Sequence, residues 1–449
     1  MFSQLAKFRP GALAASYRDL LSGAWPDSSK LPVVYHDSYN IRFLGLEKLH
    51  PFDSCKYAKV LAGLQKQGLL HKAWTVKPRQ ATLEVLADVH TQRYIGDIHA
   101  HPSTVAQVTE LAPLACLPMC LLERFVLAPM RYHVGGTMLA AALALERGWA
   151  VNLGGGMHHA AADRGMGWCP FDDIVLAVRR ARAAAHAADA ASAGTAGAAA
   201  GADPGPASTS GPAAGNAGAG AGLGAGAGAA SGPVAEGTEG SSGQQGLGSS
   251  GPGAGGRQGQ GQGQAEGLGQ GRGQGQGQGQ AGERIKVLVI DLDAHQGNGV
   301  ERDKLEYDMA DFYILDAYNE GVFPADRLAK SAIDVPMPLR PLTPTATYLQ
   351  LLDRALERAA EQLPRPDLVV YNAGTDVLEG DPLGGLAVSA AGVIQRDERV
   401  WRWCLETARC PVLMLLSGGY APESAAVITA SLANLFRTFR LGMAPPAGE

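Results

Sequence analysis

Short apolar runs alternate with longer amphipathic stretches along both halves of the chain. Each of four runs contains several hydrophobic residues in succession. Each run ends at, or is followed by, a glycine, serine, aspartate or asparagine. An uninterrupted apolar run of this length is typical of a strand that is buried on both faces of a parallel sheet. The runs predict strands at Ala150–Leu153, Lys286–Asp291, Leu368–Asn372 and Val412–Ser417.

Helical periodicity, with apolar side chains three and four positions apart, lies between these runs. It predicts helices over Thr137–Arg147, Ile174–Ala185, Thr345–Gln362 and Gly392–Ala408. Strands that alternate with helices indicate a single α/β domain of three layers, in which helices cover both faces of a central, mostly parallel sheet. Ligands of such sheets bind where the strands end, so the polar residues after each run are the first candidates for chemistry.

The stretch from 184 to 282 breaks this pattern. It holds more than half of the chain's 59 glycines, together with alanine, serine and a repeated Gly-Gln, and almost no large apolar side chain. Such a composition buries too little surface to offset the entropy of ordering. We therefore predict a long disordered insertion at 184–282 within one folded domain made of 31–183 and 283–441. Residues 1–30 form an N-terminal extension and 442–449 a short tail.

Composition narrows the class of protein. With 449 residues, 46% of them hydrophobic, the chain can bury a large core, and its net charge of -5 argues against a nucleic-acid binder. Six cysteines without a C-x-x-C pair indicate reduced thiols in an intracellular protein, and no apolar run is long enough to span a membrane. Lys7, Arg9 and Arg18, with no acid before residue 19, leave organellar targeting open.

Asp293 and His295 follow one apolar strand and project to the same side of an extended segment. Asp376, which follows another strand, is the best third ligand, and three ligands would leave one position open at a catalytic zinc. An isolated Asp-x-Asp-x-His is equally often a turn or helix cap. A two-metal manganese site would need further carboxylates, whereas the neutral Gln296 and Asn298 come next, so we predict a single metal.

Two adjacent histidines, His158 and His159, follow a turn of three glycines and Met157. Hydrolysis of an amide needs a base for the attacking water and an acid for the leaving amine, and histidine serves both purposes at neutral pH. Asp291 is a suitable hydrogen-bond acceptor for His158, and Asn298 for His159. Because a neutral amide stabilises imidazolium less than a carboxylate does, we expect His159 to be the more readily neutral of the two.

Three aromatic residues follow glycines close to these groups. Tyr420 follows Gly-Gly after the last strand, where its hydroxyl could polarise a substrate carbonyl and donate to a developing oxyanion. Trp168 and Phe323 could flank a narrow slot that grips the apolar stem of a long side chain. Packing in the core is the alternative for both rings.

Together these motifs resemble those of class IV histone deacetylases, which have the arginase/deacetylase fold. The resemblance covers the two segments that flank the Gly-Gln insertion and excludes the insertion itself. The stretches that carry it are Tyr39–Asp53, Glu146–Trp149, Gly154–His159, Asp291–Asp303 and Tyr371–Leu386.

The resemblance implies a role for each candidate residue. It implies zinc bound by Asp293, His295 and Asp376, with His158 and His159 as the acid–base pair. It further implies Tyr420 as the carbonyl-polarising group, a substrate tunnel that includes Gly156, Trp168 and Phe323, and a structural potassium ion near Asp291. Trp168 stands where the family usually has phenylalanine, and Met157 replaces a more usual aromatic residue. Gln296 and Asn298 differ from the His and Asp of other deacetylases but match class IV.

The expected function is zinc-dependent removal of acetyl or longer fatty-acyl groups from lysines of histone tails or other proteins. Such an enzyme is expected in the nucleus or cytoplasm, in chromatin regulation and with co-repressor-type partners. Two alternatives stay open. One is an amidohydrolase of the same fold that acts on small acylpolyamines, and the other is a non-catalytic scaffold that binds partners through the Gly-Gln insertion. The second needs the loss of a catalytic group, and none is missing.

Overall fold

The computed structural model describes residues 2–43, 45–200 and 285–442, with the side chains of 192–200 left out. Within these ranges seven parallel strands form one sheet in the order β1-β2-β7-β6-β3-β4-β5. The strands are β1 Val33–Val34, β2 Trp149–Asn152, β3 Val287–Asp291, β4 Phe312–Asn319, β5 Val335–Leu339, β6 Leu368–Asn372 and β7 Val412–Leu415.

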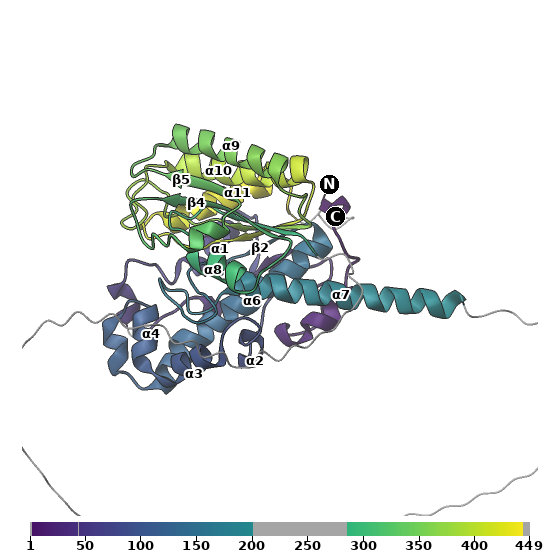
Figure 1. Cartoon of the computed structure of the whole chain (residues 1–449), viewed down its shortest axis with the longest axis horizontal. Helices are drawn as coiled ribbons and strands as arrows, with labels where there is room; N and C mark the ends of the chain where they lie inside the picture. The colour runs from purple at the N-terminus through teal and green to yellow at the C-terminus, as the bar shows by residue number, and fades with distance from the viewer. Residues whose placement is uncertain (1, 44, 201–284, 443–449) are drawn as a thin grey trace, which may run out of the picture. The chain divides into compact units, whose positions relative to one another are not determined.

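Helices cover both faces of this sheet (Figure 1). The α-helices are α1 Lys56–Lys66, α2 Leu83–Leu86, α3 Gln92–Ala100, α4 Pro102–Val108, α5 Met119–Leu122, α6 Ala128–Arg147, α7 Asp173–Ala200, α8 Asn298–Glu306, α9 Thr345–Gln362, α10 Ala390–Arg402 and α11 Ser424–Thr438. Short 3-10 helices span Phe2–Gln4, Ala14–Leu20, Asp37–Tyr39, Leu46–Leu49, Lys72–Trp74, Ala112–Cys116 and Ala329–Ala332, and π-helical turns span Glu123–Leu127 and Trp403–Ala408.

The strands divide their side chains between two hydrophobic cores. In β3, Val287 and Val289 enter the core that contains α6 and α7, while Leu288 and Ile290 enter the core that contains α1, α9, α10 and α11. This division follows from the two-residue repeat of a strand, which turns successive side chains to opposite faces. Both faces are therefore apolar, as the uninterrupted hydrophobic runs indicate, and the predicted three-layer α/β fold is confirmed.

The four predicted strands and the four predicted helices are all present; β6 and α9 have the predicted ends, and the ends of the others are shifted. Three strands were not predicted, each for a physical reason. The first, β1, has two residues, and β4 is interrupted by the buried Asp316. The edge strand β5 reads Val-Pro-Met-Pro-Leu, with both prolines exposed, which is a pattern that suits an edge rather than the interior of a sheet.

Two features of the described residues cross predicted domain boundaries. Leu13, Tyr17 and Leu20, from the segment regarded as an extension, are buried in the core with α6 and α7. Helix α7 continues to Ala200, past the predicted start of the insertion at 184. The rest of that insertion and the C-terminal tail, apart from residue 442, lie outside the described residues, so the predicted disorder stays a prediction.

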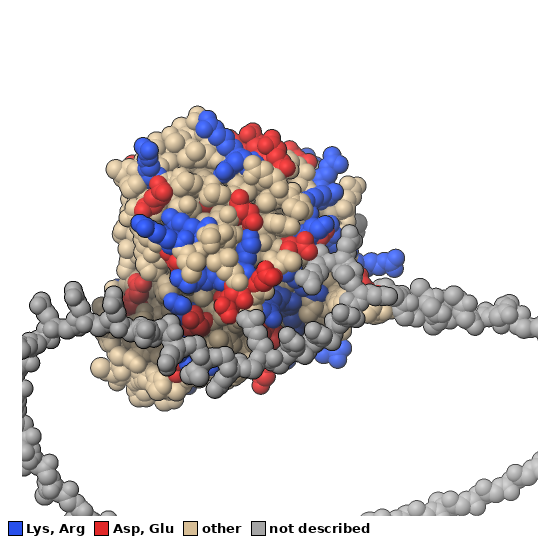
Figure 2. Space-filling model, viewed as in Figure 1, with Lys and Arg blue, Asp and Glu red and all other residues tan. Residues whose placement is uncertain are grey.

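Three predictions made from composition can be compared with the structure. All six cysteines have free thiols, as expected. Among the helices in the described ranges, none combines the length and apolar character needed to cross a bilayer. On the face shown in Figure 2, Lys and Arg side chains are intermixed with Asp and Glu side chains, in keeping with the small net charge.

Candidate active site

The glycine turn after β2 is fixed by a carboxylate that the sequence did not single out. Asp173, at the start of α7, accepts the N–H of Gly156 at 2.9 Å and that of Met157 at 2.7 Å. Gly156 has a φ of +86°, and a Cβ atom there would lie 2.2 Å from Oδ1 of Asn372. Only glycine fits this position. The turn places His158 and His159 at the carboxyl edge of the sheet.

Each histidine has the hydrogen-bond partner that the sequence predicts. Nδ1 of His158 lies 2.8 Å from Oδ2 of Asp291, and Nδ1 of His159 lies 2.9 Å from Oδ1 of Asn298. Burial lowers the pKa of His158, but the carboxylates of Asp291 and Asp293 outweigh it and raise this pKa to about 9. Burial, with the nearby charges of His158 and His295, holds the pKa of His159 well below its usual value. The directions of the two shifts agree with the expectation that His159 is the more readily neutral imidazole.

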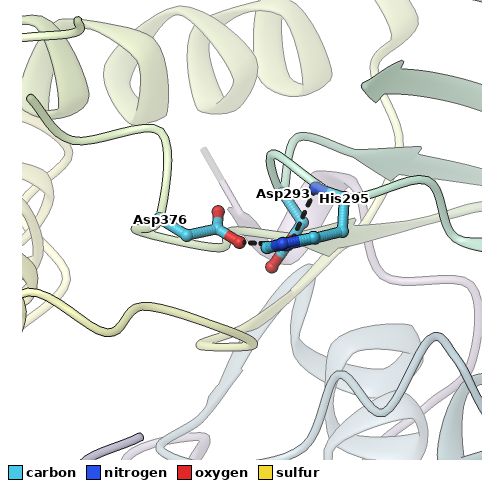
Figure 3. Close-up of side chains that lie close together, drawn as sticks. All are labelled: Asp293, His295 and Asp376. Carbon is cyan, nitrogen blue, oxygen red and sulfur yellow. Dashed lines mark hydrogen bonds and ion pairs between the residues drawn. The ribbon is translucent and has the colours of Figure 1, made fainter. Parts of the chain in front are cut away.

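Asp293, His295 and Asp376 meet beside this pair, at the carboxyl ends of β3 and β6 (Figure 3). Their ligand atoms all lie within 4.8 Å of one another, and the three side chains are buried. Nδ1 of His295 lies 2.7 Å from Oδ2 of Asp376 and 3.1 Å from Oδ1 of Asp293. In a tetrahedral zinc site the ligand atoms are about 3.3 Å apart. Small movements would therefore bring the three groups to zinc geometry.

The charge of this cluster also suits a cation. Burial and the neighbouring charge of Asp293 raise the pKa of the Asp376 carboxyl to about 8. Two buried carboxylates this close repel each other, and a divalent ion between them would remove that cost. The donor set of one imidazole and two carboxylates is one that zinc accepts. The residues therefore fit the predicted metal.

Tyr420 lies close to His295 of the cluster, on the loop after β7. Its ring centroid is 6.0 Å from that of His295. The carboxylate of Asp381 accepts the backbone N–H of Tyr420 at 2.7 Å and that of Ala421 at 2.9 Å, which fixes this loop against the loop after β6. Burial, with the charges of Asp293 and Asp376, raises the pKa of Tyr420 well above its usual value. Its hydroxyl therefore stays protonated and able to donate.

A narrow cavity of about 40 Å³ lies beside these groups. Gly156 and Trp168 line it, as predicted for the substrate tunnel. Phe323 is not among its lining residues, but its ring is 5.3 Å from that of His159 and its surface is 49% exposed. The full lining consists of Phe52, Tyr57, Met130, His133, Gly155, Gly156, Met157, His158, His159, Gly167, Trp168, Cys169, Ser417, Gly418 and Tyr420.

Sequence reasoning missed Phe52, which lines the cavity, and His50, which lies beside it. The rings of His50 and Phe52 each lie within about 6 Å of both Trp168 and Tyr420. Both residues belong to the stretch 39–53, which carries part of the family resemblance but received no role. An aromatic pair inside a matched motif, outside any strand or helix pattern, is the signal that could have identified them.

A buried arginine on α10 connects the two loops that carry the metal-site residues. The guanidinium of Arg396 donates to the carbonyl of Leu292, directly before Asp293, and to the carbonyls of Ala373 and Gly374, shortly before Asp376. Nε of Arg396 also donates to Asp397 at 2.8 Å, and the Arg396 side chain is fully buried. One side chain therefore holds both loops in register.

Replacing Arg396 with methionine is expected to lower the free energy of unfolding by about 3 kcal/mol, because a buried charge pair loses one partner and three carbonyls lose their donor. Urea denaturation would measure the change. Arg399→Met, on the same helix but with its side chain 36% exposed, is the matched control and should change stability by less than about 0.5 kcal/mol. Equal effects of the two substitutions would contradict the assigned contacts.

The functional groups come from β2, β7, β6 and β3, which are four consecutive strands of the sheet. A parallel sheet of this form, with a buried Asp-His-Asp cluster at its carboxyl edge, defines the arginase/deacetylase class of α/β protein.

Comparison with known proteins gives the family. The histone deacetylase domain matches residues 50–189 and 278–436. Histone deacetylase 2 of Arabidopsis thaliana is 36% identical over 409 residues, which are 91% of this chain and 79% of that protein. An uncharacterized protein of Picosynechococcus is 26% identical over 392 residues, 87% of this chain and 92% of its own length. Histone deacetylase 8 of Xenopus tropicalis is 28% identical over 35% of this chain and 42% of its own length. The chain belongs to the histone deacetylase family of hydrolases.

Proposed function

We propose that the protein is a zinc-dependent lysine deacylase of class IV, acting on acetyl or longer fatty-acyl lysines of histones or other proteins. The observation that carries the proposal is the meeting of Asp293, His295 and Asp376 within 4.8 Å, next to the paired His158 and His159. Gln296 and Asn298, which stand where other deacetylases have charged or titratable residues, support assignment to class IV.

Asp293, His295 and Asp376 would hold the zinc ion. When bound, zinc supplies Lewis acidity to a substrate carbonyl and lowers the pKa of a water molecule. Ser417 and Gly418 support this arrangement, since Oγ of Ser417 and the N–H of Gly418 donate to Oδ2 of Asp293 at 3.1 and 3.2 Å. They orient the carboxylate before any ligand arrives.

The chain's own groups would then handle the protons. His159 is held neutral, so its imidazole can accept a proton from the attacking water. His158, paired with Asp291, stabilises the charge that develops beside it and keeps its tautomer fixed. The hydroxyl of Tyr420 donates to the oxyanion formed from the acyl carbonyl. The leaving lysine amine takes its proton from the histidine pair, which returns the site to its starting state.

The cavity suits a long side chain with an acyl group at its end. Gly156 and Trp168 would flank the apolar stem of the lysine. Tyr57 and Met130 add further apolar wall to the cavity. Activity on acyl groups longer than acetyl remains a prediction from the family resemblance. Co-repressor-type partners, a role in chromatin regulation and a location in the nucleus or cytoplasm remain predictions from the family resemblance.

We also propose a structural potassium ion near Asp291. Asp316 and Glu301, both buried, each leave one carboxylate oxygen without a hydrogen-bond partner among the described residues. Burial raises the pKa of Asp316 well above its usual value, and the charges of Glu301 and Asp291 add to the shift. A monovalent cation held by oxygens of Asp291 and Asp316 would offset the repulsion among these buried carboxylates.

The test is hydrolysis of a set of peptides that carry one lysine with acyl groups from acetyl to myristoyl. We expect turnover that is lost after chelation and restored by zinc. An acylated polyamine serves as the competing substrate: turnover of the polyamine with no turnover of any peptide would replace lysine deacylation by small-molecule amide hydrolysis. No turnover of either compound by zinc-loaded protein would refute both.

A further inference from the structure

Leu342 combines two unfavourable features. Its φ is +60°, in the left-handed region that a branched side chain rarely adopts, and its side chain is 72% exposed. Among the described residues, Trp168 and Leu342 are the two large apolar residues with a positive φ. Trp168 lines the cavity at the active site, and strained backbone of this kind concentrates at functional sites.

Leu342 lies in a group of loops at the carboxyl edge of the sheet. It follows β5, and its N–H donates to the carbonyl of Gly385 at 2.9 Å. A Cβ atom on Gly385 would lie 3.7 Å from Val322, the neighbour of Phe323. The loops after β4, β5 and β6 therefore touch one another. Three of their exposed apolar side chains are here named the apolar shelf: Phe323 at 49%, Leu342 at 72% and Leu383 at 37% exposure.

Two members of the apolar shelf are linked to residues that line the cavity. Phe323 packs edge-on to the ring of His159 at 5.3 Å. The N–H of Leu383 and the N–H of Tyr420 donate to the same carboxylate, that of Asp381. Two of the three members are thus joined to residues of the active site, and the backbone of Leu342 is hydrogen-bonded to Gly385, two residues after Leu383.

We propose that Leu342 is a specificity-determining residue that contacts an apolar side chain flanking the acyl-lysine of a polypeptide substrate. The inference rests on the proposed function. A lysine whose stem fills the cavity leaves its own backbone at the entrance, and each neighbouring residue lies only about 3.5 Å further along the chain. The flank of the substrate must therefore cross the surface around the entrance, where contact with Leu342 would cover its exposed side chain.

The experiment compares Leu342→Gly with the parent on three compounds: a peptide with leucines flanking the acyl-lysine, the same peptide with serines, and an isolated acyl-lysine amide. Glycine relieves the strained φ, so the variant should melt at or above the temperature of the parent. We expect kcat/KM for the leucine-flanked peptide to fall about tenfold, because one apolar contact is lost. The other two compounds should be turned over at the rate of the parent.

Leu305→Ala is the matched control, since Leu305 is 43% exposed on α8 and alanine suits a helix. It should leave all three rates unchanged. A parent without preference for the leucine-flanked peptide would overturn the inference and favour another occupant of the apolar shelf, such as a second copy of the chain. Equal losses on all three compounds would also overturn it. In both cases turnover of the isolated amide by the parent leaves the proposed function standing, whereas absence of any turnover refutes the function and the inference together.

Discussion

Replacing Asp376 with asparagine is expected to remove zinc from the protein and to lower its activity more than about 10⁴-fold, a loss of over 5 kcal/mol in transition-state stabilisation. Asparagine keeps the shape of the side chain and can still accept the N–H of Ala294, which now bonds to Oδ1 at 2.8 Å. It loses the negative charge that faces His295. Two ligands in place of three should fail to retain zinc, since loss of even an outer partner costs 10–100-fold in affinity.

Zinc content after dialysis and the rise in melting temperature on zinc addition would measure this effect apart from catalysis. Asp353→Asn is the matched control, because Asp353 is half-exposed and pairs with Arg399 at 3.0 Å away from the cluster. The metal-free variant should melt close to the metal-free parent. Full zinc content and parental activity in Asp376→Asn would exclude Asp376 as a ligand and, with it, the proposed metal site.

Replacing His159 with alanine is expected to lower kcat about 10³-fold, close to 4 kcal/mol, with little change in KM. The reason is that His159 is the imidazole held neutral beside the cluster, with the amide of Asn298 as its partner. Its role falls in the proton-transfer step rather than in binding of the acyl-lysine. Steady-state kinetics with a saturating acyl-lysine peptide would give the two constants separately.

His36→Ala is a useful control for this substitution, since His36 stacks on Tyr132 and has no contact with the cluster among those described. It should leave kcat unchanged. The zinc content of His159→Ala should match that of the parent, because His159 is not one of the three ligands. A variant that kept a tenth or more of the parental kcat would show that another group accepts the proton.

The residues of the candidate metal site could be predicted because each belongs to a local pattern. Asp293, His295 and Asp376 directly follow apolar strands, and the edge of a parallel sheet brings such positions together whatever their distance along the chain. The order β2-β7-β6-β3 could not be predicted from the same patterns. It depends on which strands pair, and an apolar run does not specify the strand beside which it lies.

The supporting residues were harder to find. Asp173 acts on Gly156 and Met157 through the packing of α7 against the sheet, and nothing in its own neighbourhood in the sequence indicates this. Arg396 did leave a signal. It shares a helix face with the buried Val393 and Val400, so it is a charged residue on an apolar stripe. A charge at such a position needs buried partners, and the partners are the carbonyls of the two ligand loops.

The pairing of β2 with β7 sets the relative positions of the candidate catalytic and metal-binding residues. His158 and His159 belong to the segment before residue 201, whereas Asp293, His295, Asp376 and Tyr420 belong to the segment after residue 284. The parallel contacts from Trp149↔Val412 to Asn152↔Leu415 join these segments within the sheet. A slip of two residues in this register would carry the histidines about 6.6 Å along the strand direction, beyond reach of their partners. The alignment of the candidate catalytic residues therefore depends on four noncovalent residue pairs between β2 and β7.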